Sequence, residues 1–180
     1  MTTALLLIDL QNDYFADEEL GRCRADLLAA CNGLLEEARR AGALVVEVQT
    51  VHDPDRSTWT LNMLEDDQGV VLAGTCGARR LDDLHEADHV VVKTRDSAFH
   101  RTELAEVLAA HEVGRVVLTG VSTESCIAAT ATDAYAHDLR VVLVRDATAS
   151  VDEALHDQVL ERLQQQYRQE VVWAENVVFA

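Results

Sequence analysis

The chain has 180 residues, of which 48% are hydrophobic and 26% are charged, and its formal net charge at pH 7 is −17. Such a chain can bury one hydrophobic core, so we expect a single domain over residues 1–180. The acidic charge argues against nucleic-acid and membrane-surface partners, because both attract basic residues.

Hydrophobic patterning predicts strands and helices that alternate along the chain. The run ALLLID at 4–9 predicts a strand buried on both faces, and apolar residues spaced three and four apart predict a helix over 25–41 that Gly42 ends. The alternation continues with strands at 43–48, 89–92, 115–120, 140–144 and 170–173 and helices at about 102–111, 124–137 and 153–168. We therefore predict an α/β fold with a parallel sheet and helices on both faces.

Residues 50–88 interrupt this alternation. They contain Pro54, the only proline of the chain, and Trp59, and they are long for a plain connection. Long loops within compact domains are often functional, so we expect this stretch to shape a site.

Polar and reactive side chains follow the predicted strands. Ligands bind beyond the carboxyl ends of parallel strands, and the residues at those ends are Asp9, Thr50, His52, Lys93, Asp146 and the stretch 120–126, which finishes on Cys126. A carboxylate, an ammonium and a thiol should therefore meet at one edge of the sheet. Lys93 is the only lysine beside 14 arginines, which indicates a position that needs a compact ammonium unless codon composition alone explains the bias.

These three side chains suit nucleophilic catalysis by a thiol. We expect Thr123 to cap a helix whose third residue is Cys126, with Asp9 taking the thiol proton and Lys93 favouring the thiolate. Each residue alone has an ordinary alternative, since polar groups at strand ends are often solvated and a free cysteine usually behaves as a small buried apolar side chain. Their convergence favours the catalytic interpretation.

Composition also bears on the compartment. The apolar runs are far shorter than the roughly 20 residues of a membrane span, and no targeting segment is recognisable at the N-terminus. The cysteines show neither a CxxC pair nor zinc-finger spacing and lie at Cys23, Cys31, Cys76 and Cys126. We expect a cytoplasmic protein with free thiols.

Three stretches carry a resemblance to a known family. LLLIDLQNDYF at 5–15, VVVKTRDSAFHRTEL at 90–104 and VVLTGVSTESCIAATATDAYAHDLRVVLVRDA at 116–147 resemble the isochorismatase-like cysteine hydrolase superfamily, which includes nicotinamidases, carbamoylsarcosine amidohydrolases, and ureidoacrylate and biuret hydrolases. The resemblance implies a six-stranded parallel sheet of order 3-2-1-4-5-6 and a catalytic triad of Asp9, Lys93 and Cys126. It also implies a cis peptide between Val121 and Ser122, with the backbone N–H groups of Ser122 and Cys126 as the oxyanion hole.

The sequence departs from the nicotinamidase branch at that branch's metal site. The resemblance implies a metal-binding Asp-x-His after the second strand, whereas this chain reads TVHDPDRSTW at 50–59. Thr50 stands in place of the carboxylate and Thr58 falls at a further histidine position, so the ligand set for zinc or iron is incomplete. We predict no metal and no other cofactor, and we interpret His52 as a loop or pocket residue.

The predicted activity is hydrolysis of a carbon–nitrogen bond in a small amide, ureide or carbamoyl compound through a thioester on Cys126. True isochorismatases cleave a vinyl ether and need no thiol, so Cys126 favours carbon–nitrogen bonds. The predicted substrate contacts are Gln11, Phe15, Trp59, Arg95, Phe99 and Val121, with Arg95 binding a carboxylate. Core packing is the alternative for the aromatic residues, and a surface ion pair is the alternative for Arg95.

Other functions stay open at this level. One is a nicotinamidase-type or pyrazinamidase-type amidase with a degenerate metal site, and another is a noncatalytic binding protein that retains the fold. A phosphoacceptor module is disfavoured because no second acidic residue adjoins Asp9 to hold magnesium. We also expect a homo-oligomer, a dimer or larger, since family members often complete their sites across subunits and EVVWAENVVFA at 170–180 leaves an apolar tail.

Overall fold

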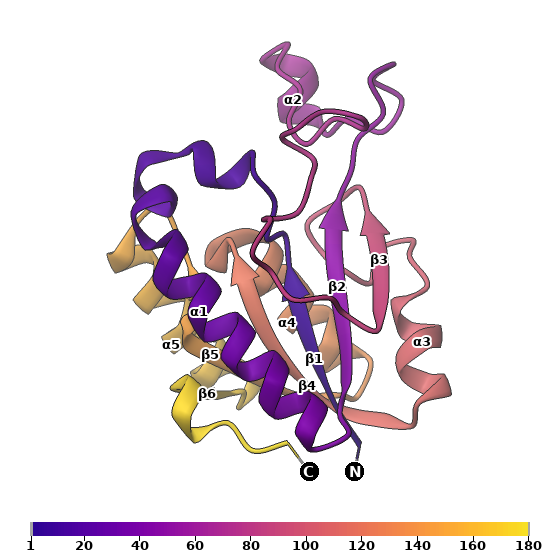
Figure 1. Ribbon diagram of the computed structural model, residues 1–180. Helices are drawn as coiled ribbons and strands as arrows, with labels where there is room; N and C mark the ends of the chain where they lie inside the picture. The colour runs from indigo at the N-terminus through magenta and orange to yellow at the C-terminus, as the bar shows by residue number, and fades with distance from the viewer. Residues whose placement is uncertain (1, 180) are drawn as a thin grey trace.

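The structure is a computed structural model that describes residues 2–179, and a six-stranded parallel sheet forms its centre (Figure 1). The strand order is β3-β2-β1-β4-β5-β6, and every pair of neighbours is parallel, which confirms the predicted sheet. The strands are β1 Thr2–Ile8, β2 Leu44–Thr50, β3 His89–Lys93, β4 Val113–Val121, β5 Arg140–Ala149 and β6 Glu170–Val172.

Helices cover both faces of this sheet, as predicted. The helix α1, Glu18–Arg40, lies across one face, and α3, Leu104–Ala110, α4, Ala128–Ala136, and α5, Glu153–Tyr167, lie on the other (Figure 1). Alternate residues of each strand therefore enter two separate hydrophobic clusters. Leu5 and Leu7 of β1 pack with the apolar stripe of α1, whereas Leu6 and Ile8 pack with residues of α3, α4 and α5.

Two helices differ from their predicted bounds. The helix α1 begins at Glu18 rather than near residue 25, because the Asp17 side chain accepts hydrogen bonds from the N–H groups of Glu19 and Leu20. The predicted helix at 124–137 is divided into a π-helical turn, Thr123–Ile127, followed by α4. Thr123 therefore lies inside the turn and does not cap it, and its hydroxyl is hydrogen-bonded to Nδ1 of His156 at 2.8 Å.

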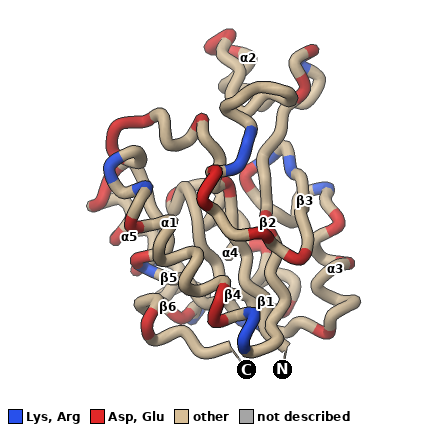
Figure 2. The backbone as a smooth tube through the Cα atoms, in the orientation of Figure 1, with Lys and Arg blue, Asp and Glu red and all other residues tan. Residues whose placement is uncertain are grey.

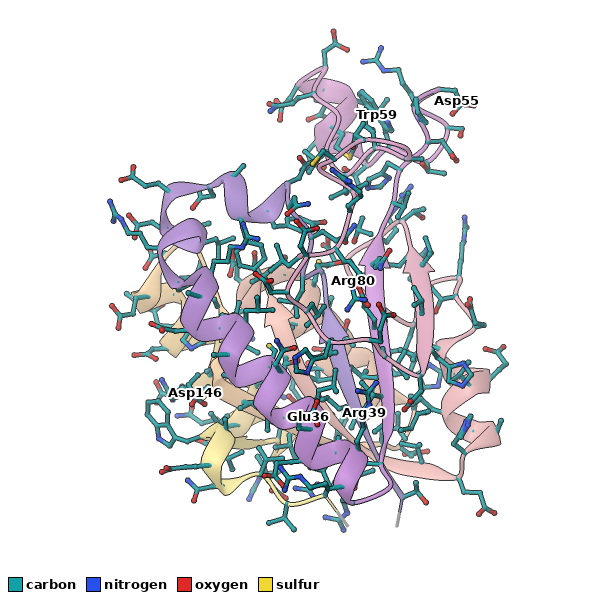
Figure 3. All side chains as sticks on the ribbon, in the orientation of Figure 1. Glu36, Arg39, Asp55, Trp59, Arg80 and Asp146 are labelled. Carbon is teal, nitrogen blue, oxygen red and sulfur yellow. The ribbon has the colours of Figure 1, made fainter. Side chains whose placement is uncertain are left out.

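The long segment 51–88 extends beyond the carboxyl ends of β1, β2 and β3 and contains a short helix that the sequence did not predict, α2, Leu61–Glu65 (Figure 1). Its return limb is tied to the sheet by main-chain hydrogen bonds, including that from Leu81 N–H to the Leu10 carbonyl at 2.8 Å. Figure 3 shows Arg80 in front of β2, where its Nε lies 3.3 Å from the buried Glu47 carboxylate. These contacts hold the segment above the edge at which ligands were predicted to bind.

Gly120 allows β4 to lie against β1 at this edge. Its φ is +110°, and a Cβ placed there would lie 1.9 Å from the Ile8 carbonyl oxygen. We expect Gly120→Ala to lower the free energy of unfolding by at least about 2 kcal/mol, because the clash is with main chain and cannot be relieved by a rotamer change. Gly33→Ala on α1 is the control, since Gly33 is exposed with open space around it. That control should stabilise the protein by roughly 0.5–1 kcal/mol in urea unfolding.

Acidic residues occupy helices, loops and turns around the sheet, with basic residues scattered among them in the same view (Figure 2). Among residues 2–179, no helix has the length and apolar character that crossing a membrane requires. The apolar residues after β6 divide into two groups. Val177 and Phe179 pack against the α1 side of the core, whereas Trp173 and Val178 are exposed.

Candidate active site

The structure brings Asp9, Lys93 and Cys126 together at the predicted edge. The Lys93 ammonium Nζ lies 2.8 Å from Asp9 Oδ2 and donates a hydrogen bond to Cys126 Sγ at 3.3 Å. The side chains of Lys93 and Asp9 are fully buried, and Cys126 is 6% exposed. A buried ion pair therefore lies in direct contact with a thiol.

Each of these residues follows a strand. Asp9 succeeds β1 with a φ of +55°, which aspartate tolerates better than most residues, and its N–H donates to the Val48 carbonyl at 2.8 Å. Lys93 is the last residue of β3. Cys126 lies in the π-helical turn after β4, which closes with a hydrogen bond from Ile127 N–H to the Ser122 carbonyl at 3.1 Å. The peptide between Val121 and Ser122 is cis, as the resemblance implied.

Charge and burial set the protonation of the buried group. Burial alone would lower the pKa of Lys93, but the Asp9 carboxylate and Cys126 outweigh it and raise that pKa above its ordinary value. Burial and then the Asp9 carboxylate raise the pKa of the Cys126 thiol, and Lys93 offsets this only in part. Burial therefore favours the neutral form of the Cys126 thiol, whereas the sequence had suggested a thiolate.

A cavity of about 180 Å³ opens onto Cys126. Its walls come from Tyr14, from the end of β2 and from the segments 60–71 and 94–96. Burial, followed by the nearby Asp9 carboxylate, raises the pKa of the Tyr14 phenol, so Tyr14 is a neutral hydrogen-bonding group. The cavity is large enough for a small molecule and places it against the thiol.

Known proteins share this arrangement of sequence and fold. Residues 3–175 match the isochorismatase domain family. The chain belongs to the isochorismatase family. An isochorismatase family protein from Desulfovibrio vulgaris has the same fold, with 30% sequence identity and a TM-score of 0.87 over 97% of this chain and 95% of that one.

Several proteins with assigned names are similar in sequence to this chain. A probable inactive nicotinamidase from Arabidopsis thaliana is 36% identical over 164 residues, which cover 86% of this chain and 84% of that protein. A streptothricin hydrolase from Streptomyces noursei is 36% identical over 83% of this chain and 50% of its own length. A ureidoacrylate amidohydrolase from Caulobacter vibrioides is 30% identical over 82% of this chain and 76% of its own length.

Of the six predicted substrate contacts, the structure brings Arg95 to the cavity. Phe15 and Val121 pack in the hydrophobic cluster under α1, and Phe99 packs against the opposite cluster and stacks on His137. Figure 3 shows Trp59 in the protruding segment near α2, where its Nε1 donates to the Asp53 carbonyl at 3.0 Å. Phe15 and Phe99 thus follow the core-packing alternative, Val121 is also a core residue, and Trp59 packs within the protruding segment.

Gln11, the sixth predicted contact, is fully buried and holds the main chain of Thr50. Its Nε2 donates to the Thr50 carbonyl at 2.8 Å, and its Oε1 accepts from the Thr50 N–H at 2.9 Å. The same Nε2 also donates to the Ala78 carbonyl at 2.8 Å. Gln11 therefore joins the end of β2 to the return limb of the long segment, and its amide is occupied within the protein.

Sequence reasoning missed part of the cavity wall, including Tyr14, Met63 and Val71. Val71 is a β-branched residue with a φ of +48°, which is rare, and its N–H donates to Asp13 Oδ2 at 2.7 Å. The carboxylate of Asp13 thereby fixes a wall residue from 58 positions away in the chain. No local pattern marks either residue, because the contact depends on how the segment 51–88 folds back.

The residues around His52 do not form a metal site. Nδ1 of His52 lies 2.9 Å from the Thr58 carbonyl, and Thr50 is hydrogen-bonded within the buried group rather than facing His52 as a ligand. Within the part of the chain that the structure describes, no three or more His, Cys, Asp or Glu side chains are grouped as metal ligands. His52 instead lines the cavity, as the sequence suggested, and burial lowers its pKa, so it is neutral at pH 7.

Proposed function

We propose that this protein is a cysteine-dependent hydrolase that cleaves a carbon–nitrogen bond of a small amide, ureide or carbamoyl compound. The observation that carries the proposal is the contact of Lys93 Nζ with both Asp9 and Cys126 at the floor of the cavity. Membership of the isochorismatase family supports it, as does the ureidoacrylate amidohydrolase among the relatives.

The proposed first step is attack by the Cys126 sulfur on the substrate carbonyl carbon while Asp9 accepts the thiol proton. The tetrahedral intermediate then collapses, the carbon–nitrogen bond breaks, and Asp9 returns the proton to the departing nitrogen. A thioester is left on Cys126. A water molecule, deprotonated by Asp9, attacks this thioester and releases the acid together with the thiol. Each proton that Asp9 takes is given back within the cycle.

Two features of the site stabilise the negative charges that form during the reaction, first on the Cys126 sulfur and then on the oxygen of the tetrahedral intermediate. The Lys93 ammonium lies against the sulfur and stabilises negative charge on it once the proton has moved to Asp9. We propose that the backbone N–H groups of Ser122 and Cys126 bind the developing oxyanion, since Ser122 caps the turn that presents the sulfur and Cys126 lies within it.

Arg95 points to a substrate that carries a negative charge. Of the described residues that line the cavity, only Arg95 is cationic at pH 7, and the partners of its Nη1 are the uncharged carbonyls of Thr58 and Thr94. Asp96 also lines the cavity, but Arg95 makes no ion pair with it or with any other described acidic residue, so the guanidinium charge is available to a substrate carboxylate. For two amides or two ureides that differ only in a carboxylate group, we expect the compound with the carboxylate to have the higher kcat/KM.

A paired substrate screen tests this proposal. Wild-type protein and Arg95→Ala are compared on amides and ureides with and without a carboxylate, and ammonia release is recorded. The substitution should raise KM for carboxylate substrates by about 10-fold to 100-fold, a loss typical of a charge-assisted hydrogen bond, with little change for neutral ones. An equal effect on both kinds of substrate would remove Arg95 from charge recognition. Failure to hydrolyse any member would contradict the proposed function.

The similarity to a probable inactive nicotinamidase supports a second candidate, a noncatalytic binding protein. The intact group of Asp9, Lys93 and Cys126 favours the hydrolase. The nicotinamidase-type alternative is distinguished by dialysis against a chelator, because a metal-dependent amidase would lose activity that the proposed mechanism retains.

A further inference from the structure

A fourth side chain, Thr50, enters the buried group; sequence reasoning had noted it as a strand-end residue and as the residue in place of a metal ligand, without a role in the chemistry. The Thr50 hydroxyl donates to Asp9 Oδ1 at 2.8 Å and accepts from Lys93 Nζ at 2.7 Å. Thr50 is 4% exposed, and it faces Lys93 across the β2–β3 pairing as its register partner. Its hydroxyl thus lies between the proposed base and the ammonium.

We propose that Thr50 is a positioning residue that fixes the Asp9 carboxylate for proton transfer with Cys126. The proposal rests on the proposed function and concerns the part of this chain's own site that replaces the carboxylate of the nicotinamidase branch.

The donors and acceptors determine the direction of each hydrogen bond. Lysine can only donate, so the single hydroxyl hydrogen of Thr50 must point to Asp9 Oδ1. Lys93 has three N–H groups, and three acceptors surround it: Asp9 Oδ2, Thr50 Oγ1 and Cys126 Sγ. Oδ1 of Asp9 therefore accepts from the Thr50 hydroxyl, Oδ2 is ion-paired with Lys93, and the ammonium has three polar neighbours.

This arrangement matters because the Asp9 carboxylate has no strong rotational preference of its own. Rotation about the terminal torsion of aspartate is broad, so packing and hydrogen bonds decide where its oxygens point. Without the Thr50 hydroxyl, Oδ1 of Asp9 loses its donor and Lys93 loses one of three acceptors. Both groups can then turn relative to the sulfur, and small errors in such geometry slow a reaction strongly.

The main chain of Thr50 is itself clamped. Gln11 pairs with both its N–H and its carbonyl, and Gln11 is fully buried. The hydroxyl therefore cannot move with a flexible strand end, which is what a positioning role requires.

Thr50→Val tests the proposal, since valine has the shape of threonine without the hydroxyl. We expect kcat to fall by about 10-fold to 100-fold with KM within about twofold, and Thr50→Ser to recover most of kcat. The rate at which iodoacetamide alkylates Cys126, followed by peptide mass mapping at pH 7, should fall in Thr50→Val and recover in Thr50→Ser. Thr50→Ala replaces Thr50→Val if the latter does not fold.

Thr148→Val is the matched control, because Thr148 is a buried strand residue whose hydroxyl bonds to the Val144 carbonyl. Thr148→Val should leave both kcat and the alkylation rate of Cys126 unchanged. Wild-type kcat and alkylation in Thr50→Val, no recovery with serine, or an equal loss in Thr148→Val would each overturn the proposal. Alkylation requires no substrate, and Cys126→Ala is assayed in parallel. Activity in Cys126→Ala would therefore contradict the proposed function separately.

Discussion

Cys126→Ala is expected to lower kcat for the best amide or ureide substrate by roughly 10⁴-fold or more, because no other group can form the thioester. Cys126 is small and buried, so alanine fills most of its volume and the fold should be retained. Ammonia release gives the rate, and far-ultraviolet circular dichroism with urea unfolding checks the fold. Intact mass measured during turnover should show an acyl adduct on wild-type protein and none on the variant.

Cys23→Ala is the control for this experiment. Cys23 is a half-buried residue of α1 whose thiol bonds to the Leu20 carbonyl, and it packs against the cluster under α1, whereas Cys126 belongs to the cluster on the opposite face of the sheet. It should retain wild-type kcat and the adduct. Substantial turnover by Cys126→Ala would exclude covalent catalysis, and a folded wild type without adduct or turnover on any substrate would favour the noncatalytic alternative.

Lys93→Met is expected to lower the free energy of unfolding by about 3–5 kcal/mol as well as to abolish activity. Methionine fills a similar space, but the substitution leaves the Asp9 carboxylate buried without its cation, and an unpaired buried charge is costly. Asp9→Asn leaves the ammonium without its carboxylate and should be destabilising for the same reason. Urea unfolding at pH 7 measures both effects.

The double variant Asp9→Asn/Lys93→Met separates the ion pair from simple packing. It removes both charges, so it should be more stable than the sum of the single effects predicts, by about 1–3 kcal/mol. Exact additivity would show that the two charges are not coupled in solution. Lys93→Arg is also expected to be inactive, because a planar guanidinium cannot reach the three acceptors that surround the compact ammonium.

The sequence predicted the frame of the molecule because buried parallel strands have a strong local signature. Runs such as ALLLID are apolar on both faces, and each strand was found where its run lies. The position of Asp9, Lys93 and Cys126 followed from the rule that parallel strands end at one edge, and the strand order from family resemblance. The start of α1 was missed because its first turns are polar and the signal was one capping residue, Asp17.

The cavity wall was the least predictable part of the site. Tyr14, Met63 and Val71 reach it from separate stretches, and their meeting depends on long-range contacts such as Asp13 with Val71. Gln11 was assigned to substrate, whereas its amide pairs with the main chain of Thr50 and Ala78, contacts that depend on how β2 and the return limb fold against the residues after β1. The protonation of Cys126 depends on its burial, which could not be weighed from sequence.

The anchoring of segment 51–88 has a consequence for how new specificities can arise. The reacting groups lie at or just after strand ends, whereas half of the residues that line the cavity belong to the segment 51–88, which is held in place through Leu81, Arg80 and Asp13. Exchanging residues 60–71 should therefore change which compounds are hydrolysed without moving Asp9, Lys93 or Cys126. The catalytic residues and much of the substrate-binding wall thus lie on different parts of the fold. The corresponding segments of other family members can therefore be grafted onto this chain to change its substrate.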